Sequence, residues 1–178
     1  MLRYAITYGA IGGLIVIAAI SAVMLISGPE GAGSSQAAGY AFMLAGLSLI
    51  FVGVKRYRDV ERGGVITFGQ GFLVGLSMAV VAGIFYTIGW EGVLRATDFA
   101  FIDTYGDTLI NSIRAEGLAA AEEAARIAEV EEAMEMYRNL FFRLAITFVE
   151  IFPVGLLVAL ISAAVLRNPN VLPARANG

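Results

Sequence analysis

The carboxyl group of Glu150 is the side chain best placed to do chemistry, because it stands eleven residues into an apolar run, 140–166. An ionisable group deep in a bilayer costs about 2.5–3.5 kcal/mol, so such residues usually serve a function. Pro153 follows three residues later and predicts a helix kink beside the carboxyl group. Arg143 stands two turns earlier on the same helix face and is a candidate partner, directly or through water.

Two interpretations of Glu150 follow from this setting. In the first, a buried hydrogen bond or ion pair to the carboxyl group fixes the helix register. In the second, the carboxylate binds a proton or cation and faces an internal cavity.

Two further polar residues stand near the ends of another apolar run, 68–90. Glu91 is a candidate partner for Arg95, four residues later, or for Arg143, although an ordinary interface position is the simpler interpretation. The Gln70 amide is expected to hydrogen-bond across helices rather than to hold a ligand.

Composition excludes several kinds of chemistry. The 178 residues contain no His and no Cys, which removes the usual general base, thiol chemistry and the commonest ligands of zinc and haem. We therefore expect no enzymatic activity, no cofactor and no metal. The net charge of −3 also argues against nucleic acid as a partner.

Four apolar runs must position these residues, since a helix needs about 20 residues to cross a bilayer. They cover about 4–27, 37–54, 68–90 and 140–166 in a chain that is 58% hydrophobic, with a mean hydropathy of +0.78. The sequence therefore predicts an all-α integral membrane protein with four transmembrane helices. We expect residues 1–178 to form a single membrane domain, with an insertion at 95–139 between the third and fourth spans.

Charge predicts the orientation of the four spans. The loop 55–64 has a net charge of +2, whereas the insertion 95–139 holds four arginines and ten acidic residues, net −6. The positive-inside rule then places both termini in the cytoplasm and the insertion outside. The loop's basic residues are simply topogenic in one interpretation and candidate ligands of anionic lipid headgroups in another: Lys55, Arg56, Arg58 and Arg62.

The insertion is expected to form an extracytoplasmic helical hairpin broken at Gly117. Its second helix, about 118–137, has apolar residues at helical spacing: Ile127, Val130, Met134 and Tyr137. This stripe packs on the first helix of the hairpin in one interpretation. In another it meets a neighbouring subunit or a protein partner, and a third interpretation gives the acidic residues a role in collecting cations.

Small residues recur at four-residue spacing in three of the spans, a pattern that permits close helix contact in lipid. We expect the following glycines to pack helices: Gly9, Gly13, Gly71, Gly75, Gly83 and Gly155. Packing within one bundle is the simpler interpretation. The alternative makes one stripe, with the third span favoured, the seam of a homo-oligomer, for which we expect a dimer.

Two stretches of the chain resemble a known bacterial family. They are Lys55-Arg56-Tyr57-Arg58-Asp59 followed by Phe68-Gly69-Gln70-Gly71-Phe72, and Phe148-Val149-Glu150-Ile151-Phe152-Pro153-Val154-Gly155. The pattern is similar to the domain of unknown function numbered 4199, whose members are small four-span proteins with a charged helical insertion. The resemblance implies a bacterial cytoplasmic (inner) membrane and supplies no activity.

The sequence therefore predicts a non-enzymatic interaction or scaffold protein that self-associates among membrane lipids. The alternative is a small oligomeric transporter or channel that uses Glu150 as its proton- or cation-binding carboxylate.

Overall fold

The structure is a computed structural model that describes residues 1–33 and 36–174. It is all-helical, with 85% of residues in helices. The helices are α1 (Leu2–Gly33), α2 (Gln36–Leu47), α3 (Leu49–Glu61), α4 (Phe68–Ala96), α5 (Ala100–Ala115), α6 (Ala120–Arg138) and α7 (Leu140–Leu166).

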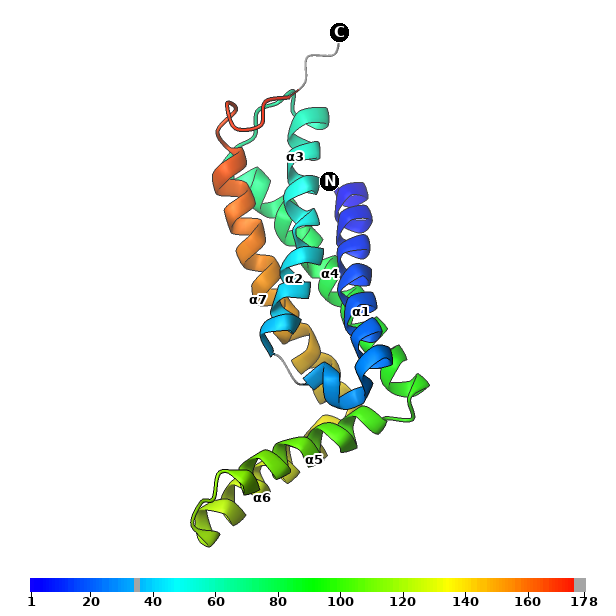
Figure 1. The fold of residues 1–178 in the computed structure, drawn as a ribbon. Coiled ribbons are helices and arrows are strands. Elements are labelled where there is room, and N and C mark those ends of the chain that lie inside the picture. The colour runs from blue at the N-terminus through cyan, green and yellow to red at the C-terminus, as the bar shows by residue number, and fades with distance from the viewer. Residues whose placement is uncertain (34–35, 175–178) are drawn as a thin grey trace.

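Four segments are long and apolar enough to cross a membrane, as the sequence predicts: Leu2–Val23, Ala37–Glu61, Phe68–Ala96 and Leu140–Leu166. They form a bundle, and α5 and α6 project together from one of its ends (Figure 1). The bundle end that carries the N-terminus and the ends of α3 and α7 is called the terminal end below. The opposite end, at α5 and α6, is the hairpin end.

Two predicted boundaries differ from the structure. Helix α1 continues to Gly33, past its expected end at residue 27. The second span ends at Glu61 rather than at 54, with its only interruption at Ser48. Lys55 and Asp59 form an ion pair at i, i+4 on α3, so the charged residues extend the helix beyond the apolar run. Lys55, the first basic residue after the apolar run, marks the expected edge of the hydrocarbon core. The helix itself continues beyond it.

Helix α4 forms the centre of the bundle, where it packs against both α1 and α7. Half of the most apolar stretch of α4 is buried, compared with 22% of the corresponding stretch of α7. Its first turn is fixed by a capping box in which the Thr67 hydroxyl accepts a hydrogen bond from the Gln70 amide N–H, while Gln70 Oε1 accepts one from Thr67 N. The expected bond from Gln70 to another helix is therefore wrong, because the side chain caps its own helix.

The small-residue stripes lie inside this bundle. A Cβ atom at Gly75 would stand 2.9 Å from Ala159 Cβ, and one at Gly155 would stand 2.9 Å from Ala79 Cβ. The other four glycines of the stripes also lie against neighbouring helices: Gly9, Gly13, Gly71 and Gly83. Since α7 covers Gly71, Gly75 and Gly83 of α4, the third-span stripe is not free to form a seam with a second copy.

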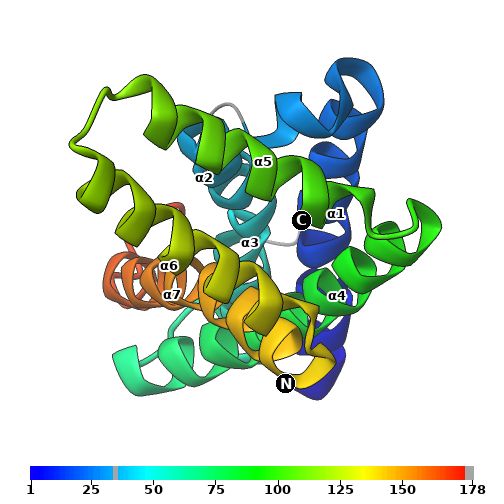
Figure 2. The same ribbon diagram turned by 90° about the horizontal axis from the view of Figure 1, so that it is seen from below.

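Helices α5 and α6 lie side by side at the hairpin end, where α5 contacts α1 and α6 contacts α7 (Figure 2). The apolar stripe of α6 is partly covered by α5, because Met134 lies against Gly106 of α5. Asn139 alone separates α6 from α7, and its side chain caps α7 by accepting hydrogen bonds from Phe141 N and Phe142 N. The direction of the chain changes at this cap, so the pair of helices leaves the bundle obliquely (Figure 1).

Candidate functional site

A buried ion pair joins α4 and α7 at the hairpin end. Arg143 Nε donates to Glu91 Oε2 at 2.9 Å, and Arg143 Nη2 donates to Glu91 Oε1 at 3.1 Å. The two side chains are 5% and 12% exposed. Arg95 adds a third, exposed donor to the same carboxylate at 2.9 Å. Glu91 therefore binds both arginines considered as its partners, and it is more than an ordinary interface residue.

The remaining donors of Arg143 join α6 to the same cluster. Its Nη1 donates to the carbonyl oxygens of Tyr137 at 2.9 Å and Arg138 at 3.1 Å. These carbonyls are at the C-terminal end of α6, where the helix dipole favours a cation. The expected pair between Arg143 and Glu150 is wrong, since every side-chain nitrogen of Arg143 already donates elsewhere. One guanidinium thus holds α4, α6 and α7 together.

The chain between α4 and α5 places an aromatic ring against this guanidinium. Asp98 and Phe99 both have positive φ, at 48° and 59°. Such backbone costs of the order of 1–3 kcal/mol for a non-glycine residue. It brings the Phe99 ring centre to 5.2 Å from Arg143 Cζ, within range of a cation–π contact.

Trp90 and Tyr137 form a second link between α4 and α6. The indole Nε1 of Trp90 donates to the Tyr137 hydroxyl at 2.8 Å, and the Phe101 ring meets the indole edge to face at 5.0 Å. Burial raises the pKa of Tyr137, so its hydroxyl stays neutral. No sequence pattern predicted this bond, although Trp90 is the only Trp in the chain and stands next to Glu91.

Glu150 lies in the membrane-spanning part of α7, seven residues after Arg143. It lies about 16 Å along the helix from its start, near the middle of a hydrocarbon core about 30 Å thick. The residue is exposed, and within residues 1–33 and 36–174 it makes no hydrogen bond or ion pair. The Tyr86 and Tyr137 hydroxyls lie in its electrostatic field. Its setting in one chain is therefore neither a buried bond nor an enclosed cavity.

The exposed residues around Glu150 form one stripe along α7. Helical spacing places Ile146, Val149, Pro153 and Leu157 on the same side as the carboxyl group, and all of them are exposed. The chain is helical on both sides of Pro153, and the kink remains a prediction. This stripe of α7 is the apolar face that the rest of the bundle leaves uncovered around the carboxyl group.

A second polar cluster occupies the terminal end, around Arg58. Its Nε donates to Asp59 Oδ1 at 2.7 Å, and its Nη atoms donate to the carbonyl oxygens of Val171 and Leu172, at 2.9 and 2.5 Å. A longer bond of 3.4 Å reaches the carbonyl of Leu166, the last residue of α7. The side chain is 0% exposed. Arg58 thus holds the chain that follows α7 against α3.

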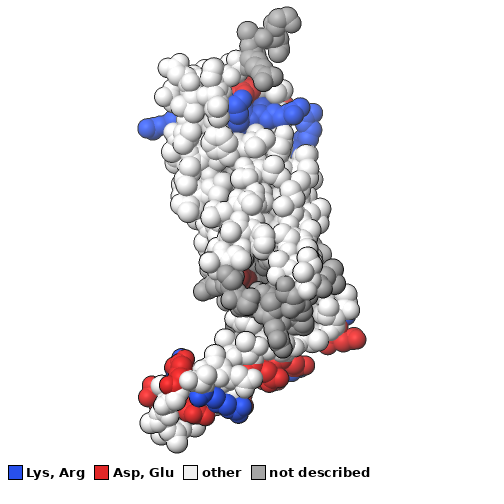
Figure 3. Space-filling model, in the orientation of Figure 1, with Lys and Arg blue, Asp and Glu red and all other residues white. Residues whose placement is uncertain are grey.

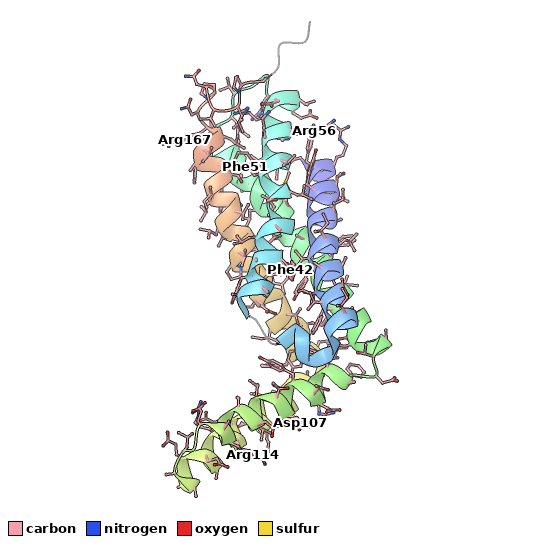
Figure 4. All side chains as sticks on the ribbon, in the orientation of Figure 1. Phe42, Phe51, Arg56, Asp107, Arg114 and Arg167 are labelled. Atoms are coloured by element: carbon pink, nitrogen blue, oxygen red, sulfur yellow. The ribbon has the colours of Figure 1, made fainter. Side chains whose placement is uncertain are left out.

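The four basic residues proposed to touch lipid headgroups therefore separate into different roles. The headgroup hypothesis is wrong for Arg58, because burial removes it from any headgroup. Lys55 is bound to Asp59. Arg56 and Arg62 are exposed and have no ion pair within the described part of the chain, and Arg56 points away from α3 beside the N-terminal end of α1 (Figure 4).

Neither cluster offers ligands for a metal ion. Across residues 1–33 and 36–174 there is no group of three or more acidic, His or Cys side chains that could hold one. At the hairpin end, the acidic side chains of Glu116 and Asp103 are instead paired with arginines of α6.

Comparison with known protein families identifies a match over most of the chain. The model of a family described as "Protein of unknown function (DUF4199)" matches residues 7–168. No curated protein and no solved structure matches the chain.

Proposed function

This chain belongs to the DUF4199 family, and we propose that it is a non-enzymatic membrane protein that self-associates through the α7 stripe around Glu150. The observation that carries the proposal is the exposed carboxyl group near the middle of the fourth span, which makes no hydrogen bond or ion pair to any described residue. A polar group in hydrocarbon without a hydrogen-bond partner is costly, so contact with another polar group stabilises the assembled form.

A second copy of the chain fits this stripe better than an unrelated partner does. A neutral carboxyl group both donates and accepts a hydrogen bond, so two Glu150 side chains satisfy one another across a two-fold axis. The other members of the stripe are apolar side chains suited to helix packing. The glycine-lined surfaces of α4 are already occupied within the chain, which leaves α7, the least buried of the four spans, for the contact.

Molar mass in detergent, measured by light scattering with and without substitutions, tests the proposal. We expect a dimer for the wild type, monomer for Glu150→Leu, and a largely retained dimer for Glu150→Gln, because an amide still hydrogen-bonds. Leu157→Trp should also weaken the dimer. Leu14→Trp on α1 is the matched control, since Leu14 and Leu157 are 49% and 53% exposed. A monomeric wild type, or an unchanged mass for Glu150→Leu, would contradict the proposal.

Transport is the second candidate function, and one arrangement favours it. Exposed Arg95 and buried Arg143 both bind the Glu91 carboxylate at the hairpin end, and Arg143 also donates to the backbone carbonyl of Tyr137, whose hydroxyl lies in the field of Glu150. In an oligomer, these polar groups would give a proton or cation access to the carboxyl group. Flux of protons and monovalent cations into proteoliposomes, compared for wild type and Glu150→Gln, decides this. Wild-type flux equal to that of empty liposomes would exclude these ions.

The proposed setting is a bacterial inner membrane with the terminal end in the cytoplasm. Lysine and arginine gather at this end of the bundle, whereas acidic residues are concentrated on the projecting helices at the other (Figure 3). Positive charge is enriched in cytoplasmic loops, which supports this orientation.

A further inference from the structure

A pocket at the terminal end combines the features of a binding site for a phosphate-bearing lipid headgroup. It has a cavity volume of about 370 Å³ and is lined by Arg3, Tyr4, Thr7, Tyr8 and Arg56. The first four residues lie on the first two turns of α1, and Arg56 lies on α3. We propose that this pocket binds the phosphodiester headgroup of an anionic membrane lipid.

The two arginines of the pocket have donors to spare. Arg56 is exposed and has no ion pair within the described residues. Arg3 donates through Nη2 to Glu61 Oε1 at 3.2 Å, and its side chain is 76% exposed, which leaves Nε and Nη1 for another acceptor. Guanidinium groups bind phosphate oxygens in pairs of parallel hydrogen bonds. Together the two side chains supply positive charge from both walls of the pocket.

The aromatic residues hold Arg3 in place and suit a membrane interface. The Arg3 guanidinium lies 5.2 Å from the centre of the Tyr4 ring, and the Tyr4 hydroxyl donates to the same Glu61 oxygen at 3.0 Å. Tyr4 stacks on Tyr8 with ring centres 6.3 Å apart. Tyrosine is enriched at headgroup depth, where one end of the ring is apolar and the other is hydrated. Glu61 does not line the pocket but accepts hydrogen bonds from Arg3 and Tyr4, so a phosphate competes with it for Arg3.

The position of the pocket favours a lipid over a free phosphate. Ile11 on α1 and Val52 on α3 are 45% and 46% exposed, and they lie within about one turn of the pocket toward the middle of the spans. An acyl chain attached to a headgroup in the pocket would cover these two side chains. Arg56 extends from α3 beside the start of α1, where it can meet a headgroup in the pocket (Figure 4).

Lipid retention by the purified full-length protein, measured by native mass spectrometry, tests the proposal. Phosphatidylglycerol, phosphatidylcholine and inorganic phosphate are the probes. We expect phosphatidylglycerol to bind several times more tightly than phosphatidylcholine, and Arg56→Gln to weaken it about fivefold, as for one basic contact at a membrane surface. Arg62→Gln is the matched control, because Arg62 is exposed at the same end, outside the pocket. Arg3→Gln should weaken retention as Arg56→Gln does.

Three results would overturn the proposal. Equal losses for Arg56→Gln and Arg62→Gln would show attraction to the whole basic end rather than a site. Equal retention of the two lipids would remove the role of the anionic phosphate. Inorganic phosphate that competes at the concentration of the lipid would make the ligand a free anion.

Discussion

Arg143 and Glu91, 52 residues apart in the chain, are joined by two parallel hydrogen bonds at the hairpin end of the bundle. The same guanidinium also binds the last carbonyls of α6. Arg143 therefore holds the C-terminal end of α6 against the bundle and so helps to set the direction in which α5 and α6 project.

Removal of the Glu91 carboxylate should destabilise the protein strongly. Breaking one side of a buried ion pair costs about 3–5 kcal/mol, because the other charge stays behind without a partner. We expect Glu91→Gln to lower the midpoint of unfolding in detergent, followed by the fluorescence of Trp90, the single Trp of the chain. Arg95→Gln is the control, since this exposed pair should contribute less than about 1 kcal/mol. Equal effects of the two substitutions would refute a special role for Arg143.

Tyr137 should make stability depend on alkaline pH. Its pKa is raised by burial in the folded protein, whereas an unfolded tyrosine ionises at about pH 10. Above that pH the unfolded chain releases a proton that the folded chain retains, so stability falls as pH rises through the raised pKa. In the wild type, the free energy of unfolding should fall between about pH 9 and 11. In Tyr137→Phe this fall should be smaller. The substitution should also cost about 1 kcal/mol at neutral pH through the lost hydrogen bond to Trp90.

The spans were predictable from sequence because each carries its own signal. Phe68–Ala96 and Leu140–Leu166 begin at the expected residues, since an apolar run of sufficient length is helical in lipid whatever surrounds it. The glycine stripes were predictable for a similar reason, because a spacing of four defines a face before its partner is known.

Partners between distant segments were not predictable in this way. The spacing within one helix offered Glu150 as a partner of Arg143, and Glu91 was the other candidate. Only the packing of α4 on α7 shows that Glu91 is the partner. The burial of Arg58 depends on the chain after Leu166, which turns back over α3. No local sequence pattern predicts this turn. For Glu150 the depth was evident, whereas its exposure became visible only with the whole bundle.

Helix contact at Gly75 should be intolerant of larger side chains. A Cβ atom there would stand 2.9 Å from Ala159 Cβ, and overpacking typically costs about 1–3 kcal/mol. We expect Gly75→Leu to lower the unfolding midpoint or prevent folding. Gly92→Leu on the same helix is the matched control, because nothing lies within 4 Å of a Cβ at Gly92. If Gly92→Leu were as damaging as Gly75→Leu, helix contact would not be the cause.

The proposed orientation predicts which residues a membrane-impermeant reagent can reach. The chain has no cysteine, so a single introduced Cys gives an unambiguous signal with a maleimide. We expect Glu129→Cys, exposed on α6, to be labelled in intact cells, and Arg62→Cys, exposed at the terminal end, to be labelled only after the membrane is opened. The reverse labelling pattern would invert the proposed orientation in the membrane, because the two positions lie at opposite ends of the bundle. It would also place the basic pocket of Arg3 and Arg56 in the outer leaflet, where positive charge is not enriched.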